Sequence, residues 1–390
     1  METLILGWYV LVETDSVLLL TVFGAMQLTG TLVAPLFGLA GDRIGHRNLL
    51  CGMRMVYTLL ATTLMAIAFA GVVNPSIVLL VSALMGLVRP SDMGVRSALI
   101  ADSMPSDRLM PAIGISRTTT DMARVLGALT GAGVFAAFGM GPAYIVVASF
   151  YATGSILTAA ITNTSSSAAA PATAAVAVLE PRASAWSDLR AGMAYVWSRP
   201  QLLAAMWLAF LVNFTAYPLS SGLLPFVARE IYRIDQTGLG YLAASFALGA
   251  LSGSMVVSQR RALRPGRTMI IAALAWYLAL LLFAQVANAS GGVVMLVLAG
   301  FAQSFCMVTL AVLLLRTTSA KFRGRVMGVR MLAIYSMAIG LALAGALIER
   351  LGFQATATLY ACVGLLCTLI IAFNWRSELW LAEAPANARP

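Results

Sequence analysis

Long apolar runs separated by short polar breaks dominate the chain from end to end. A membrane-spanning helix needs roughly 20 mostly apolar residues, and runs of that length recur throughout the sequence. We expect a short first helix over about 1–12. Eleven full helices are expected over about 16–40, 48–71, 75–99, 109–138, 141–162, 201–228, 236–259, 267–287, 292–317, 325–349 and 353–374. The pattern predicts an all-α membrane protein.

One long polar break, 163–200, divides the chain into two parts of six helices each. Its first part is rich in Ser, Ala, Thr and Pro, as a flexible linker is. Its second part places Trp186, Leu189, Met193 and Trp197 on one face of a helix, which predicts an amphipathic helix at the membrane interface. We therefore expect an N-terminal half (1–162), a cytoplasmic linker (163–200), a C-terminal half (201–376) and a cytoplasmic tail (377–390).

The first apolar run is shorter than a membrane-spanning helix. Twelve helical residues cover about 18 Å, whereas the hydrocarbon core is about 30 Å thick. The run has no basic start and no small-residue cleavage site, so it does not resemble a signal peptide. We expect the complete helix to begin upstream of Met1, with a natural half-helix as the alternative.

Composition agrees with a membrane protein. Of the 390 residues, 60% are hydrophobic and 10% are charged, against about 45–50% and about 25% in soluble domains. This excludes a soluble enzyme, a disordered regulator and a disulfide-stapled secreted domain.

The net charge of +10 reflects an uneven distribution of arginine and lysine. If the connection between the second and third helices is cytoplasmic, only Arg229, Arg233 and Arg350 of the 25 basic residues lie in outer loops. Because cytoplasmic loops of membrane proteins are enriched in Lys and Arg, this predicts a cytoplasmic C-terminus. The basic charge then indicates topology and not a nucleic-acid partner.

The most specific segment is Gly38-Leu-Ala-Gly-Asp-Arg-Ile-Gly-His-Arg47, between the second and third helices. It resembles the signature loop of the major facilitator superfamily, carried here by Gly38, Gly41, Asp42, Arg43, Gly45 and Arg47. The resemblance implies a 6+6 helix fold with two pseudo-symmetric halves. It also implies that Asp42 meets the N-terminus of the helix beginning near Arg325, where the helix dipole favours a negative charge, and so latches the two halves. The alternative is an ordinary solvated turn.

Further segments resemble one bacterial efflux branch of that superfamily, the enterobactin-exporter-like and macrolide-efflux-like permeases. They include Asp92-Met-Gly-Val-Arg96 and Phe322-Arg-Gly-Arg-Val-Met-Gly328. This resemblance implies drug:proton antiport across the bacterial inner membrane. The fifth helix carries Gly127-Ala-Leu-Thr-Gly131-Ala where antiporters of the family usually have Gly-Pro-x-x-Gly-Gly. Gly127 and Gly131 therefore act either in coupling or only in close helix packing.

Ionisable residues inside membrane helices are functional candidates, because burying them is costly. Here they are Arg89, Asp92 and Arg96 on one helix, with Arg117, Asp121 and Arg124 on the next. They form either a coupling site and gate, with Asp121 as the proton carrier, or a structural ion-pair network. Since arginine is in excess, we expect an anionic or zwitterionic amphiphile as substrate.

A substrate cavity is expected between the two halves near mid-membrane. Asn213, Tyr217 and Ser220 recur at helical spacing on one face, and Gln303 is the main polar residue of the tenth helix. Gln27 and Tyr9 complete the candidate set. Each of these polar groups either contacts substrate or makes an interhelical hydrogen bond.

The sequence offers no enzymatic chemistry. It has no phosphate-binding Gly-Lys-Ser/Thr loop. A single histidine and cysteines without paired spacing provide no metal site, so neither metal nor cofactor is expected. We expect a monomeric, proton-coupled exporter whose partners are a small molecule, protons and lipid. The alternatives are a siderophore exporter, a lipid translocator, or a non-transporting sensor or partner subunit on the same fold.

Overall fold

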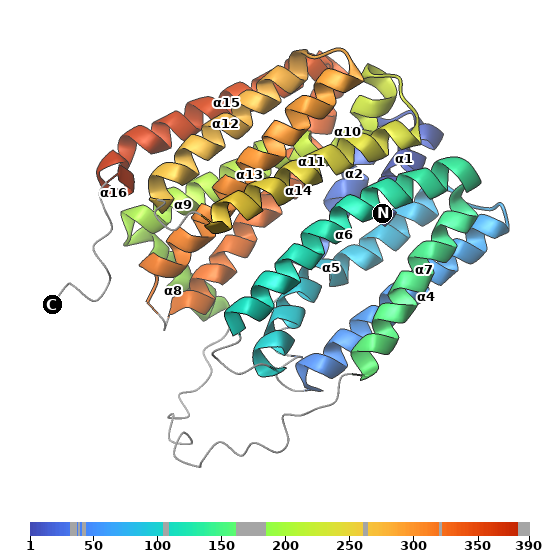
Figure 1. The fold of residues 1–390 in the computed structure, drawn as a ribbon, viewed down its shortest axis with the longest axis horizontal. Helices are drawn as coiled ribbons and strands as arrows, with labels where there is room; N and C mark the ends of the chain where they lie inside the picture. The colour runs from blue at the N-terminus through green and yellow to red at the C-terminus, as the bar shows by residue number, and fades with distance from the viewer. Residues whose placement is uncertain are drawn as a thin grey trace. The chain divides into compact units, whose positions relative to one another are not determined.

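The computed structural model describes residues 1–31, 37, 40, 44–103, 109–160, 185–259, 264–319 and 322–380. Regular structure in these ranges is entirely helical, as Figure 1 shows. Gly38, Gly41, Asp42 and Arg43, the linker residues 161–184 and the tail 381–390 lie outside the described residues, so the expected latch of Asp42 stays a prediction.

Most helices occur where the apolar runs predict them. The expected extent of the second helix, 16–40, was wrong, because the α-helix that begins at Val17 ends at Met26 and a 3₁₀ turn follows it. The first part of the chain contains α1 (Glu2–Thr14), α2 (Val17–Met26), the short 3₁₀ helix η1 (Thr29–Thr31), α4 (His46–Phe69), α5 (Pro75–Ser103), α6 (Leu109–Phe138) and α7 (Met140–Ala160). The predicted linker helix is α8 (Ala185–Trp197).

The second part continues with a composite helix, Pro200–Ile231. It is made of α9 (Pro200–Leu211), the π-helical turns η3 (Val212–Ala216), η4 (Pro218–Gly222) and η5 (Val227–Ile231), and the short α10 (Leu224–Phe226). Five helices follow: α11 (Gln236–Gln259), α12 (Pro265–Gln285), α13 (Ala289–Thr317), α14 (Arg323–Leu351) and α15 (Phe353–Asn374), with α16 (Arg376–Trp380) at the end.

Length and hydropathy identify nine of the described helices as candidate membrane spans. Two shorter apolar stretches, Val17–Thr31 and Pro75–Arg89, and the helix α1 stand where the other three spans are expected. The all-helical membrane fold predicted from the sequence is therefore confirmed.

Glycines end several helices because they tolerate backbone angles that other residues avoid. Gly45 has φ = +86° and immediately precedes α4, and Gly352 has φ = +80° between α14 and α15. Asn288 caps α13 by accepting a 2.7 Å hydrogen bond from the Gly291 amide. The two glycines and the Asn288 cap mark the boundaries of these helices.

The described chain forms two compact units. The first contains residues 1–26, 121–139 and those from 191 onward, and the second contains residues 27–120 and 140–190. The helix α6 contributes to both units. The predicted division into halves 1–162 and 201–376 stays a prediction.

In the second unit, α4 packs along α7 and beside α5. Tyr57 and Tyr151 stack with ring centroids 5.2 Å apart, and the hydroxyls of Thr58 and Ser155 lie 3.2 Å from each other. Polar side chains can stabilise helix pairs in a membrane in this way, since no water competes for them.

In the first unit, α11 and α12 both pack along α13 (Figure 1). The approach is close: a Cβ at Gly249 would lie 2.0 Å from the Val297 carbonyl oxygen. On the other side α2 packs along α14, where a Cβ at Gly345 would lie 2.2 Å from the Thr21 hydroxyl oxygen. Small residues at these crossings let backbones approach, which is the main source of packing energy between helices in lipid.

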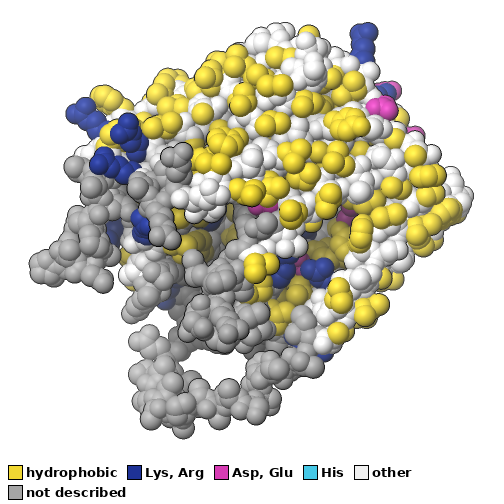
Figure 2. All heavy atoms as spheres, viewed as in Figure 1, with side chains coloured by type: hydrophobic (Ala, Val, Ile, Leu, Met, Phe, Trp, Pro, Cys, Tyr) yellow, Lys and Arg dark blue, Asp and Glu magenta, His cyan; other side chains and the backbone are white. Residues whose placement is uncertain are grey.

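The outward surface of these helices is apolar. Figure 2 shows hydrophobic side chains spread over the face that carries α11, α12 and α13. Leu248, Leu278 and Leu298 are each about half exposed there. An apolar surface of this extent requires lipid and not water as its solvent.

Candidate functional site

The composite helix and α13 bring two of the predicted cavity residues together. Gln303 donates a hydrogen bond from Nε2 to the hydroxyl oxygen of Tyr217, at 2.7 Å. The Tyr217 ring meets Trp276 edge-on, with centroids 5.1 Å apart. Gln303 is buried and Tyr217 is half-buried. The result is one polar pair held against an aromatic wall inside an apolar core.

The other two residues of the expected polar face make local hydrogen bonds. Asn213 donates from Nδ2 to the Ala209 carbonyl oxygen, and Ser220 donates from Oγ to that of Ala216, both at 2.8 Å. Ser220 is fully buried. The π-helical turns change the angular spacing of 3.6 residues per turn on which the predicted face depended. Tyr217 thus reaches across to α13, whereas Asn213 and Ser220 bond carbonyls of their own helix.

Gln27 and Tyr9 lie elsewhere. Gln27 accepts a hydrogen bond from Arg89 Nη1 at 2.5 Å, within the second unit. Tyr9 is half-buried on α1, beside the buried Trp8. The structure therefore joins Gln27 to the arginine cluster.

The charged residues of α5 pair differently from what their spacing suggests. Asp92 lies 3.8 Å from Arg54 on α4, which the sequence analysis did not include. Arg96 donates to the Thr120 hydroxyl at 2.9 Å, and Arg89 is occupied by Gln27. A lone arginine two turns into an apolar helix was the signal that could have identified Arg54.

On α6 the expected pair of Asp121 and Arg124 is present. Their nearest oxygen and nitrogen are 3.7 Å apart, one helical turn along the chain. The Asp121 side chain is 7% exposed, whereas that of Arg124 is 58% exposed. The side chain of Arg117 lies outside the described residues. Asp121 is thus a buried acid, and the Arg124 side chain that pairs with it is largely exposed.

Glu2 is a second buried acid in the first unit and was missed from the sequence. Its relative exposure is 7%, and it opens α1. It lies twelve positions before Thr14, which is about 18 Å along the helix. An acid at the start of an otherwise apolar run was the available signal.

Gly127 and Gly131 on α6 face the start of α1. A Cβ at Gly131 would lie 2.5 Å from Cγ of Met1, and one at Gly127 would lie 3.5 Å from its backbone nitrogen. The absence of side chains at these two positions lets α1 approach α6 closely, which places Glu2 and the α6 acid Asp121 within the same compact unit.

Of the six residues that carry the signature-loop resemblance, the structure describes Gly45 and Arg47. Gly45 begins α4 with the positive φ noted above, and Arg47 donates from Nη2 to the Ala159 carbonyl oxygen on α7. Arg47 therefore ties the start of α4 to the end of α7. Among the described residues, no cluster of three or more His, Cys, Asp or Glu side chains could hold a metal ion.

Comparisons with known proteins give one consistent answer. The family model described as Major Facilitator Superfamily matches residues 4–338. No curated protein matches the sequence.

Solved structures of transporters share the fold. A POT family transporter in complex with 5-aminolevulinic acid superposes with a TM-score of 0.71 at 12% identity, covering 97% of this chain and 94% of that one. The nucleoside transporter NupG gives a TM-score of 0.66 at 14% identity, covering 97% and 95%. A POT family transporter in complex with a thioalcohol-conjugated peptide gives 0.70 at 12% identity, with the same coverage as NupG. The family match over most of the chain and the shared helical fold lead to one conclusion: this chain belongs to the Major Facilitator Superfamily.

Proposed function

We propose that this chain exports a small amphiphilic molecule across the bacterial inner membrane by alternating access, driven by proton entry. The observation that carries the proposal is the Tyr217–Gln303 hydrogen bond, set against Trp276 in an apolar surrounding. A few polar groups in a mostly apolar and aromatic setting are typical of sites that bind small molecules. The breaks of the composite helix into π-helical turns support the proposal, since such turns are frequent at functional sites.

The charge distribution supports an anionic or zwitterionic substrate. Away from the ends of α4 and α5, Arg54, Arg89 and Arg96 carry three positive charges and Asp92 carries one negative charge. In the second part of the chain, the described acids stand near helix ends or in connections, as Glu230, Asp235, Glu349 and Glu378 do. A membrane protein with surplus positive charge in its helices attracts anions in preference to cations.

Proton coupling requires a carboxylate that is shielded from bulk water and can change its charge during the cycle. Glu2 and Asp121 fit that requirement because both are buried in the first unit. Counting from the end of α6 at Phe138, Asp121 lies about 26 Å deep, whereas Glu2 lies about 18 Å from the end of α1. Glu2 is therefore nearer to mid-membrane and is the stronger candidate for proton carrier. A siderophore exporter and a lipid translocator remain alternative versions of the same export function.

Everted membrane vesicles containing the protein test the proposed substrate class. Uptake is measured for three fluorescent amphiphiles of similar size, one anionic, one zwitterionic and one cationic. We expect uptake of the anionic or zwitterionic probe, and we expect Tyr217→Phe and Gln303→Ala to weaken it. The matched control is Gln285→Ala, at an exposed glutamine that bonds Thr358 near the end of α12. Uptake of the cationic probe alone would refute the substrate class, and uptake of none would favour a sensor or partner subunit.

A further inference from the structure

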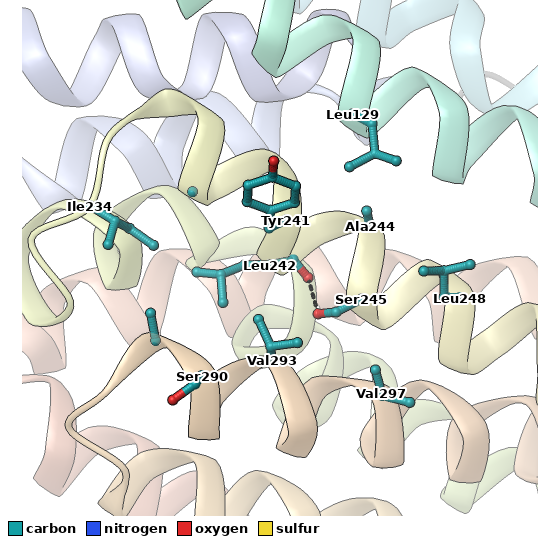
Figure 3. Close-up of a pocket in the computed structure, with 12 residues that line it drawn as sticks. Leu129, Ile234, Tyr241, Leu242, Ala244, Ser245, Leu248, Ser290, Val293 and Val297 are labelled. Carbon is teal, nitrogen blue, oxygen red and sulfur yellow. Dashed lines mark hydrogen bonds between the residues drawn. The ribbon is translucent and has the colours of Figure 1, made fainter.

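An apolar groove lies on the first unit where α6, α11 and α13 meet. It encloses 540 Å³, within the range of about 300–1,000 Å³ typical of ligand sites. Figure 3 shows Leu129 reaching toward it from α6, above Ala244 and Leu248 of α11, with Val293 and Val297 of α13 on the other side. These helices also carry the apolar outward surface of Figure 2, so the groove opens toward lipid.

The two serine hydroxyls in the lining are already bonded within the protein. Ser245 donates to the Leu242 carbonyl oxygen at 2.7 Å, the bond drawn in Figure 3. Ser290 lies 3.5 Å from the Asn288 side-chain oxygen, at the end of the groove. With both serine hydroxyls occupied by the protein, the space presents hydrocarbon to its occupant. A polar solute would lose its hydration there without gaining hydrogen bonds.

The groove has the length of one membrane leaflet. Its lining on α11 runs from Gly238 to Leu248, which is about 15 Å of helix. That is half of a hydrocarbon core of about 30 Å. Tyr241 is 59% exposed near the start of α11, where an aromatic ring with a polar tip suits the level of the headgroups. A chain lying in the groove would therefore extend from the headgroup level to mid-membrane.

A cation stands at the headgroup end. Arg233 is exposed, directly precedes the lining residue Ile234, and makes no ion pair with any residue that the structure describes. Its backbone has φ = +53°, which is uncommon for a residue of its size. The neighbouring acid Asp235 accepts a hydrogen bond from the Gly238 amide and so caps α11. Arg233 is the basic group nearest in sequence to the groove.

We propose that this groove binds one acyl chain of a phospholipid and that Arg233 binds the phosphate of the same lipid. Apolar lining, leaflet length and an arginine at the headgroup end together match the two chemically different parts of such a molecule. Arginine binds phosphate through several donors in a fixed plane, which suits it to this role. The site is separate from the Tyr217–Gln303 pair, so it does not depend on the transported substrate.

Photocrosslinking in proteoliposomes tests the proposal. The probe is a phosphatidylglycerol with a diazirine on its acyl chain, diluted in phosphatidylcholine, and adducts are mapped by mass spectrometry. A diacylglycerol with the same labelled chain serves as a probe without phosphate. We expect phosphatidylglycerol adducts to concentrate on the peptides that contain Leu129, Tyr241 and Val293. Arg233→Gln should lower them about fivefold, the contribution of one arginine near an anionic lipid surface, and Arg233→Lys should restore part of the loss. Diacylglycerol adducts should not respond to either change.

A bulky substitution tests the role of the groove separately from that of Arg233. Val293→Trp fills it, whereas Val294→Trp places the same ring at the neighbouring, 53% exposed position, which is not part of the lining. We expect only Val293→Trp to remove the adducts. The proposal would be overturned if the phosphatidylglycerol adducts were equally abundant in Val293→Trp, Val294→Trp and Arg233→Gln and were spread over all lipid-facing helices. Should Val293→Trp fail to fold, the arginine series decides the question alone, because Arg233 is exposed.

Discussion

Arg229 joins the end of the composite helix to the end of α1. Its Nη2 lies 2.6 Å from Asp15 Oδ1, and its Nη1 donates to the Leu11 carbonyl oxygen at 2.6 Å. Asp15 has φ = +49° and follows α1, and its backbone amide also donates to the Leu11 carbonyl oxygen. The guanidinium therefore bonds both the Asp15 side chain and a carbonyl of the last turn of α1. The arginine distribution predicts that this end faces outside. The helix α2, which follows Asp15, packs along α14.

We expect Arg229 to hold this end closed. Because Asp15 is 78% exposed, the ion pair itself contributes only about 0–1 kcal/mol. Asp15→Asn should therefore have a small effect, whereas Arg229→Ala removes both bonds. A cysteine at the buried Thr21, in a background without the native cysteines, reports opening through labelling by a membrane-impermeant thiol reagent. Labelling should rise markedly in Arg229→Ala and slightly in Asp15→Asn. Equal labelling of the parent protein, Arg229→Ala and Asp15→Asn would show that Arg229 does not hold this end closed.

Gly340 sets the distance between α14 and the composite helix. A Cβ there would lie 1.9 Å from the Phe214 carbonyl oxygen, which is backbone and cannot rotate away. Gly340→Ala should lower the stability by about 1–3 kcal/mol through overpacking, seen as a lower midpoint of thermal unfolding in detergent. Gly328→Ala on the same helix is the matched control, because a Cβ there meets nothing within 4 Å. That control should be neutral or stabilising, since alanine favours helix over glycine. A similar midpoint for both variants would contradict the close approach.

The linker helix α8 is expected to be clamped to the connection between α13 and α14. A Cβ at Gly192 would lie 2.8 Å from the Arg325 carbonyl oxygen, and Tyr195 stacks on Phe322 with centroids 4.3 Å apart. Burial raises the pKa of Tyr195, but the hydrogen bond from Ser319 and the charge of Arg199 outweigh it and lower that pKa overall.

Displacing α8 should loosen the backbone beside its exposed Arg190 and so make that site easier for a protease to cleave. Gly192→Leu should speed tryptic cleavage after Arg190, because the leucine cannot fit against the Arg325 backbone. Ala194→Leu, at an exposed position of the same helix, should leave the rate at the wild-type value. Cleavage that is equally fast in both variants would indicate that α8 is not held by this contact.

The contributions of the two proposed coupling carboxylates, Glu2 and Asp121, can be distinguished by neutral, isosteric substitution of each. Glu2→Gln should reduce proton-driven accumulation of substrate to near background while leaving exchange of substrate for substrate intact, because exchange needs no net proton movement. Asp121→Asn should have the smaller effect, since Asp121 lies farther from mid-membrane. Glu13→Gln, at an exposed position near the other end of α1, is the control. Wild-type accumulation in both Glu2→Gln and Asp121→Asn would exclude the two acids as proton carriers.

The fold was predictable because each span is a local property of the sequence. Apolar runs located α4, α7 and α15 to within a few residues, and the spacing of Leu189, Met193 and Trp197 located α8. Hydropathy carries this information because the bilayer imposes a fixed thickness on every crossing helix.

The candidate site was less predictable because its contacts join distant segments. Tyr217 and Gln303 are 86 residues apart, and no local pattern indicates that they meet. The π-helical turns around Pro218 shift the face on which Asn213 and Ser220 were expected, and a calculation based on regular helix spacing cannot show this. Arg54 escaped notice for a similar reason, since its partner Asp92 lies on another helix.

Reconstitution of the purified protein into proteoliposomes tests the central proposal most directly. An imposed pH gradient, acid on the side corresponding to the outer face, is combined with an anionic amphiphile, and internal pH and substrate content are recorded together. The proposal predicts substrate movement against its own gradient coupled to opposite proton flux, both abolished by an uncoupler and by Glu2→Gln. Substrate movement that follows only its own gradient, with no proton flux and no response to the uncoupler, would contradict it.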